Sequence, residues 1–240
     1  MQENNITLYA FPTGPGFFNF SPYCTKVEIL LAQAGLEFSL EMPEDYKTFS
    51  KGRLPVLNDN GSIIEDSEII RLHIAEKYGK ELDGSLTAAE KATGHAVCRM
   101  LDERTIYGLV WTRWAEDAGW SQTKPIFFEG MPDATAEEMR AQVIEAIKAV
   151  GFGKFTSEEQ KTFIRADLKT LSGLLGEREF FLSDEPTYLD ATIFGHISNL
   201  YGTPIRSWNN ELVGEHQNLV NYFNQGMARW YPNAVQAAAE

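Results

Sequence analysis

The segment Ser21-Pro22-Tyr23-Cys24 places a hydroxyl and a thiol three residues apart at a predicted helix start. Serine is a favoured N-cap residue, and proline suits the first position of a helix. A helix N-terminus presents unpaired N–H groups and a partial positive charge, and this environment stabilises a thiolate. Ser21 could therefore hydrogen-bond a bound thiolate, or Cys24 could itself be acidified. The alternative, an ordinary capped helix with a buried cysteine, is favoured by the spacing alone.

Proline interrupts a predicted strand in the segment Leu54-Pro55-Val56-Leu57. Because proline removes a hydrogen bond from the sheet, this position indicates a strand edge, a bulge or a cis peptide bond. A kink there would leave the backbone N–H and C=O of Val56 free to pair with an extended peptide ligand. A plain edge strand explains the pattern equally well.

An acid and a hydroxyl stand together at the start of a second predicted helix, in the segment Glu65-Asp66-Ser67. The carboxylate could hold an ammonium group, while Ser67 and the helix N–H groups could hold a carboxylate. Those are the two charged groups of an α-amino acid. For this segment alone, an ordinary N-cap is at least as good an interpretation.

Aromatic residues recur along a third predicted helix, where Tyr107, Trp111 and Trp114 follow each other at i, i+4 and i+7. They could form the wall of an apolar substrate pocket, or simply the core side of the helix. Further along, the segment from Thr187 to Asp190 fits a capping box before an apolar helix. We therefore expect Asp190 to serve folding and not chemistry.

Strand and helix signals alternate only in the first third of the chain. They predict a strand, a helix, three strands and a helix, at residues 6–11, 22–34, 36–41, 54–58, 62–64 and 67–78. Only helices are predicted after that, at residues 88–120, 133–151, 157–176, 189–201 and 210–231. The predicted organisation is an α/β domain over residues 1–79, a linker over 80–87 and an all-α domain over 88–240.

Composition sets aside several classes of function. Of the 240 residues, 43% are hydrophobic and 23% charged, as in an ordinary globular protein. The net charge of −13 would repel nucleic acid and anionic membranes, so we expect neither as a partner. The two cysteines, Cys24 and Cys98, are too few for a disulfide framework and lack metal-ligand spacing. We therefore expect no metal and a reducing compartment, and the absence of a signal-peptide pattern favours the cytoplasm.

Taken in order, the three N-terminal segments followed by a helical domain with a capping box resemble the glutathione S-transferase superfamily. Within it, the chain is similar to the metaxin-like and failed-axon-connections-like branch. The likeness is carried by SPYCTKVE, KGRLPVLNDNGSIIEDS, the stretch from Arg113-Trp114 to Phe127-Phe128, and FFLSDEPTYLDATIFG. The resemblance implies a thioredoxin-like N-terminal domain followed by a helical glutathione-transferase C-terminal domain.

The resemblance also implies roles at the thiol end of a glutathione site. Ser21 falls where cysteine-type classes carry their nucleophile and where serine-type classes carry the hydroxyl that activates the thiolate. Pro55 matches the cis-proline of the family, and Val56 matches the backbone contact to the cysteinyl unit. Asp66 and Ser67 match the site of the γ-glutamyl group.

Three further residues have looser assignments by resemblance. Lys51 or Arg53 could meet the glycyl carboxylate of glutathione. Phe17 lies in a loop before the first helix that is longer than in the common cytosolic classes. This loop could cover the thiol site, and we count Phe17 with Tyr107, Trp111 and Trp114 as a candidate substrate-pocket residue.

Three functions follow from these interpretations. The first is a serine-type glutathione transferase, in which Ser21 holds the glutathione thiolate while it attacks an apolar electrophile beside Tyr107, Trp111 and Trp114. The second is a single-thiol, glutathione-dependent oxidoreductase acting through Cys24, because a serine replaces the usual attacking cysteine and excludes dithiol exchange. The third is a non-enzymatic binding or scaffold protein that kept the fold. The resemblance further implies a homodimer.

Overall fold

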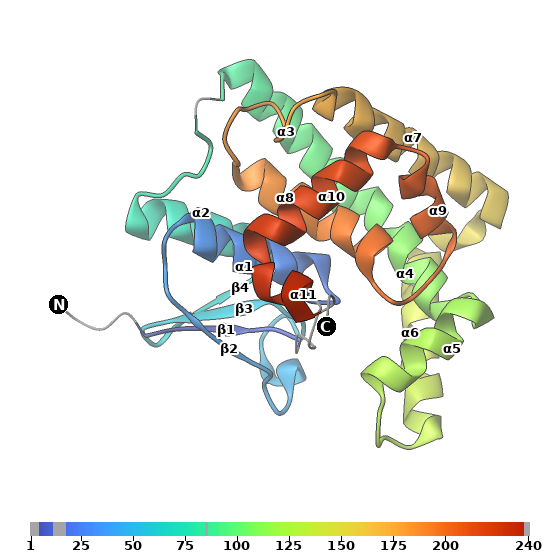
Figure 1. The fold of residues 1–240 in the computed structure, drawn as a ribbon. Coiled ribbons are helices and arrows are strands. Elements are labelled where there is room, and N and C mark those ends of the chain that lie inside the picture. The colour runs from blue at the N-terminus through green and yellow to red at the C-terminus, as the bar shows by residue number, and fades with distance from the viewer. Residues whose placement is uncertain (1–4, 12–17, 85, 238–240) are drawn as a thin grey trace.

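The computed structural model describes residues 5–11, 18–84 and 86–237 (Figure 1). Its N-terminal part contains β1 (Ile6–Tyr9), α1 (Pro22–Gln33), β2 (Ser39–Glu41), β3 (Val56–Asp59), β4 (Ser62–Glu65) and α2 (Ser67–Tyr78). A short 3-10 turn, Tyr46–Thr48, lies between β2 and β3. The β-α-β-β-β-α order predicted from the sequence is confirmed.

The four strands form one mixed sheet in the order β2-β1-β3-β4. β1 is parallel to β2 and antiparallel to β3, and β3 is antiparallel to β4. The register pairs Leu8 with Leu57, and both side chains are buried. The Leu54–Pro55 peptide bond just before β3 is cis. Because β3 is an interior strand, the edge-strand interpretation of this segment is wrong, whereas the cis bond is confirmed.

Every later element among the described residues is helical. The α-helices are α3 (Ala88–Met100), α4 (Ile106–Trp114), α5 (Asp117–Phe127), α6 (Asp133–Ala149), α7 (Ser157–Leu175), α8 (Tyr188–Ile197), α9 (Trp208–Gly214), α10 (Gln217–Trp230) and α11 (Pro232–Ala237), and a 3-10 turn, Phe152–Lys154, follows α6. A π-helical turn, Leu101–Thr105, joins α3 to α4, and another, Ser198–Gly202, extends α8. Within the described ranges, no helix is long and apolar enough to cross a membrane.

The structure corrects the single helix predicted over residues 88–120. That helix ends at Trp114, and after a two-residue turn the chain continues as α5. Gly119 permits the sharp return, because a Cβ there would collide with the backbone carbonyl of Thr112. The rings of Trp114 and Trp120 then pack with their centroids 5.5 Å apart, which holds α5 against α4.

Helix α1 belongs to both parts of the molecule. It lies over one face of the sheet beside α2, and it packs extensively against α8 (Figure 1). Residues 24–31 are all buried, so this stretch of the helix has no solvent-facing side. α1 and α8 approach closely at Gly195, where a Cβ would collide with the carbonyl oxygen of Pro22. The start of α1 is therefore fixed against the helical part of the chain.

Replacing Gly195 with alanine should destabilise the protein, because the added Cβ would push α8 away from the backbone of α1. Overpacking of this kind costs about 1–3 kcal/mol, and urea denaturation would show it as a lower free energy of unfolding. The matched control is Gly173→Ala in α7, where the surrounding space is open. That control should raise the free energy of unfolding by up to about 1 kcal/mol. A Gly195→Ala protein as stable as the wild type would contradict the close approach of the two helices.

Candidate functional site

Ser21 is the N-cap of α1, as its sequence context predicts, and its backbone is extended. Its hydroxyl accepts a hydrogen bond from the backbone N–H of Cys24 over 3.4 Å. Its own N–H donates to the side-chain oxygen of Asn19 over 3.0 Å. The side chain is half-buried, so a hydroxyl at the positive end of a helix remains within reach of a ligand.

Cys24 is fully buried in the hydrophobic core. Burial raises the pKa of its thiol to about 12, although the hydrogen bond with Ser21 lowers it in part. The expectation that the first turn of α1 acidifies Cys24 is therefore wrong, because lost hydration outweighs the helix dipole. Cys98 is also buried, and burial raises its pKa to about 11. Neither thiol is presented for chemistry.

A cleft of ≈ 400 Å³ lies between the N-terminal and the helical parts. Its N-terminal side comes from the start of α1, the segment before β3 and the start of α2: Tyr23, Arg53, Leu54, Pro55, Asp66, Ser67 and Glu68. Its other side comes from α3, the π-helical turn, α4, α6 and the residue after α6: Arg99, Asp102, Glu103, Ile106, Tyr107, Val110, Val143, Ala146, Ile147 and Val150. Four of the predicted glutathione-site residues therefore meet at one cleft.

The start of α2 supplies the polar end of this cleft. Asp66 caps the helix by accepting from the N–H of Glu68 at 3.0 Å, and it also accepts from the guanidinium of Arg53 at 3.1 Å. Its φ of 89° is uncommon for a residue other than glycine, and such backbone conformations concentrate at functional sites. Ser67 is 6% exposed and lines the cleft, and its hydroxyl bonds to no other described residue. A nearly buried hydroxyl without a hydrogen-bond partner among the described residues is available to a ligand.

The other predicted site residues lie outside the cleft or outside the described residues. Lys51 borders a separate surface depression beside β4 and α2, whereas Arg53 lines the cleft. Val56 is fully buried as the first residue of β3, and its role as a backbone contact stays a prediction. Ser21 and Val56 are not among the described residues that line the cleft. Phe17 falls outside the described residues.

The helical wall of the cleft is mainly aliphatic. Of the aromatic residues predicted to form it, Tyr107 alone is among the described lining residues. Trp111 packs beside Gly153, and Trp114 packs on Trp120 of α5. The three rings share one face of the helix, as their spacing predicts, but only Tyr107 reaches the cleft. One and two turns further along, the same face meets neighbouring elements of the helical domain instead of the N-terminal domain.

Paired charges border the polar end of the cleft. Lys26 is 1% exposed, and its ammonium lies 2.8 Å from one carboxylate oxygen of Glu68. Arg71 lies 2.7 Å from the other oxygen. Although burial raises it, the pKa of Glu68 is lowered to about 2 by Arg71 and Lys26 together. Glu68 therefore stays ionised beside Ser67 at every physiological pH.

Sequence reasoning missed the α6 wall and Tyr23. Val143, Ile147 and Val150 recur at i, i+4 and i+7, so the sequence does contain the signal of an apolar face. The spacing of these residues does not show which part of the protein the apolar face of α6 packs against. Tyr23 lies in the cleft, where its hydroxyl donates to the backbone carbonyl of Asp102 over 3.3 Å and burial raises its pKa.

A thioredoxin-like sheet domain, a helical domain and a polar-ended cleft between them define a protein of the glutathione-transferase class. The chain matches the family model described as glutathione S-transferase N-terminal domain over residues 22–119. It matches the model described as glutathione S-transferase, C-terminal domain over residues 164–225. Together the matches cover more than half of the chain. The chain belongs to the glutathione S-transferase superfamily.

Individual relatives place the chain within that superfamily. Isoprene-epoxide–glutathione S-transferase of Rhodococcus sp. (strain AD45) is 28% identical over 232 residues, 92% of this chain and 97% of that protein. Failed axon connections of Drosophila melanogaster is 29% identical over 97% of this chain, which spans 59% of that protein. Metaxins match as well, so the resemblance to this branch is confirmed. The solved structure of the β-etherase LigF from Sphingobium sp. strain SYK-6 superimposes with a TM-score of 0.65 at 18% sequence identity. The match covers 98% of this chain and 99% of the LigF chain, which confirms the fold.

Both cysteines should resist alkylation in the native protein at neutral pH, because burial keeps their thiols protonated and out of reach. Mass spectrometry after treatment with iodoacetamide should show no adduct on the folded protein. The same protein in denaturant, as the control, should carry two adducts. An adduct on Cys24 of the folded protein would reopen the single-thiol mechanism.

Proposed function

We propose that the protein is a glutathione transferase, which binds glutathione in the interdomain cleft and joins its sulfur to a small apolar electrophile. The proposal depends mainly on the meeting of Arg53, Pro55, Asp66 and Ser67 with an aliphatic wall in one cleft. Membership of the superfamily supports it. So does the 28% identity to a protein named as an isoprene-epoxide glutathione transferase, nearly all of whose length is matched.

The γ-glutamyl group of glutathione would bind at the start of α2. The hydroxyl of Ser67 and the first N–H groups of the helix receive its carboxylate, while Asp66 receives its ammonium group. Arg53 is 67% exposed and already pairs with Asp66, so it can turn to the glycyl carboxylate without leaving a buried charge unpaired. Such local donors are needed because glutathione is an anion and the protein has a net charge of −13.

The thiol of glutathione would lie at the start of α1. The hydroxyl of Ser21 donates to the thiolate, and the positive end of the helix stabilises it. The sulfur attacks an electrophilic carbon, so a sulfur–carbon bond forms while the bond from that carbon to its leaving group breaks. For an epoxide the broken bond is carbon–oxygen, and the oxygen takes up one proton in place of the one the thiol released. Positioning and thiolate stabilisation supply the rate.

The electrophile would rest on the helical wall of the cleft. Ile106 and Val110 of α4 face this space together with Val143 and Ile147 of α6. Branched aliphatic side chains of this kind give a smooth apolar surface with no hydrogen-bonding group. This lining favours an aliphatic electrophile over a polar one.

Glutathione binding, measured by isothermal titration calorimetry, tests this proposal. The wild type should bind with a micromolar to low-millimolar dissociation constant. Ser67→Ala should weaken binding about tenfold or more, because it removes a hydrogen bond to a charged group. Ser21→Ala is the matched control for binding, and its affinity for glutathione should be nearly unchanged. The same variant should lower the conjugation rate by roughly tenfold or more. A wild type that does not bind millimolar glutathione would refute the proposal.

A second candidate function is binding to another protein chain, and an exposed apolar patch favours it. We define the β4–α2 patch as Ile63, Ile69 and Leu72, whose side chains are 48%, 49% and 48% exposed. The patch borders a surface depression of ≈ 370 Å³. It lies beside β4, an edge strand of the sheet. An apolar cluster beside an open strand edge is typical of an interaction surface.

We propose that a second copy of this chain covers the β4–α2 patch, forming a homodimer in a reducing compartment such as the cytoplasm. Light scattering after size-exclusion chromatography should give twice the 27.0 kDa mass of the chain. Ile69→Glu with Leu72→Glu should give monomers, because two carboxylates would be buried in the contact. The matched control is Ile126→Glu on α5, a 40% exposed position away from the patch, which should leave the dimer intact. A monomeric wild type at all concentrations would exclude the homodimer.

A further inference from the structure

Arg113 of α4 is a buried cation that has no carboxylate partner among the described residues. It is 5% exposed, and its guanidinium donates to the carbonyl of Phe20 at 2.7 Å and to the carbonyl and side-chain oxygens of Asn199 at 2.9 and 3.1 Å. All three acceptors are neutral, and no acidic side chain of the described residues forms an ion pair with it. Burial lowers its pKa to about 9, so the guanidinium still carries its charge at neutral pH. Buried charges are normally paired, so this one calls for a counter-ion.

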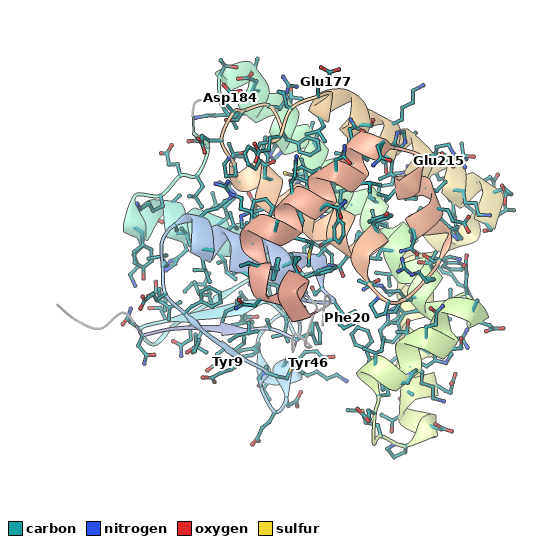
Figure 2. The ribbon with its side chains drawn as sticks, in the orientation of Figure 1. Tyr9, Phe20, Tyr46, Glu177, Asp184 and Glu215 are labelled. Carbon is teal, nitrogen blue, oxygen red and sulfur yellow. The ribbon has the colours of Figure 1, made fainter. Side chains whose placement is uncertain are left out.

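The guanidinium is held one peptide unit from the thiol site. The Phe20–Ser21 peptide is fixed at both ends, since its carbonyl accepts from Arg113 and its N–H donates to Asn19 at 3.0 Å. Asn199 completes the connection by donating to the carbonyl of Asn19 at 3.1 Å. Phe20, labelled in Figure 2, packs its ring against Phe127 of α5 with a centroid distance of 5.6 Å. The positive charge therefore stands directly behind the N-terminal end of α1.

We propose that Arg113 is a positioning residue that acts as the buried counter-ion of a thiolate held at Ser21. The identity of that thiolate, the glutathione sulfur, rests on the proposed function, whereas the potential that Arg113 creates at Ser21 does not. A nearby opposite charge favours the ionised form of an acid and lowers its pKa, most strongly where solvent does not screen the charge. The same contact polarises the Phe20–Ser21 peptide and fixes its orientation, while the N–H of Cys24 holds the Ser21 hydroxyl.

The other titratable groups around the start of α1 do not take the place of that counter-ion. On α1 itself they are Tyr23, Cys24, Lys26 and Glu28, and the ammonium of Lys26 already pairs with Glu68 at 2.8 Å. From the end of α10 Tyr231 packs against Cys24 and Glu28, and from α8 His196 packs on the ring of Tyr23. Burial raises the pKa of Glu28 to about 7, although hydrogen bonds from Tyr231 and Asn19 lower it in part. From the turn after α8, Asn199 contributes only a neutral amide. The partial charge of Glu28 opposes a thiolate and is common to every variant compared below.

A thiol placed at Ser21 measures the local potential directly and needs no glutathione. The reporter is Ser21→Cys with Cys24→Ala, which prevents a disulfide, and its thiol pKa is read from the pH dependence of alkylation. We expect this pKa to lie below the ~8.5 of a free cysteine. Adding Arg113→Met should raise it by about one unit or more, which means a tenfold loss of thiolate at neutral pH. Adding Arg113→Lys, which keeps the charge, should largely preserve the low value.

Two further variants separate charge from folding. Asn209→Ala removes a buried amide that donates to Gly108 and Thr112 of the same helix α4, without touching α1. It should lower stability and leave the reporter pKa unchanged. Arg113→Gln retains amide donors without the charge, so it replaces Arg113→Met if that variant does not fold, and it should raise the pKa equally. A reporter pKa that is the same with and without the Arg113 charge would overturn the inference.

Glutathione titration of the wild type distinguishes this inference from the proposed function. A protein that binds no glutathione, but whose reporter thiol depends on Arg113, would refute conjugation and support the buried counter-ion. A protein that binds glutathione, but whose reporter thiol ignores Arg113, would support binding and overturn the inference.

Discussion

The enclosure of α1 on every side is the constraint on which the rest of the structure depends. Because residues 24–31 are buried against the sheet domain and α8, the charged side chains in this stretch must find partners inside the protein. Lys26 pairs with Glu68 at 2.8 Å, and Glu28 accepts from Tyr231 at 2.8 Å near the end of the chain. Removing one partner of a buried pair costs far more than the pair contributes. These contacts therefore select one position of α1 between the two domains. A shifted or rotated α1 would leave its buried charged groups without partners.

The thiol site inherits its geometry from this docking. α8 is started by a capping box in which Asp190 accepts from the N–H of Thr187 at 2.9 Å and from the N–H of Phe181 at 3.0 Å. Asp190 is wholly buried, and burial raises its pKa to about 6. The box is the one predicted from the sequence, and its place in the structure shows what it does: it fixes the start of the helix on which α1 rests. Asp190, which the sequence predicts to serve folding, thus helps to place Ser21.

The features that could be predicted from the sequence are set by residues adjacent to each other in the chain. The cap at Ser21, the cis bond before Pro55 and the capping box at Asp190 all leave a local pattern of residue types. The features that could not be predicted depend on which surface meets which. Burial of Cys24 reverses the effect of the helix start, because hydration is lost to residues far away in the chain. The α6 face could be recognised as apolar, but its position across the cleft from α2 follows only from the packed domains.

Charge explains why the thiol site needs contributions from both domains. With 34 acidic and 21 basic residues, the surface surrounds any bound anion with unfavourable potential, and exposed cations are screened by solvent and salt. A buried cation is screened much less, because the effective dielectric constant of the protein interior is low. The N-terminal domain provides the hydroxyl of Ser21 and the positive end of α1, whereas the guanidinium of Arg113 comes from α4 of the helical domain. The thiolate proposed at Ser21 would therefore be stabilised only when the two domains are assembled, and the packing that encloses α1 is what assembles them.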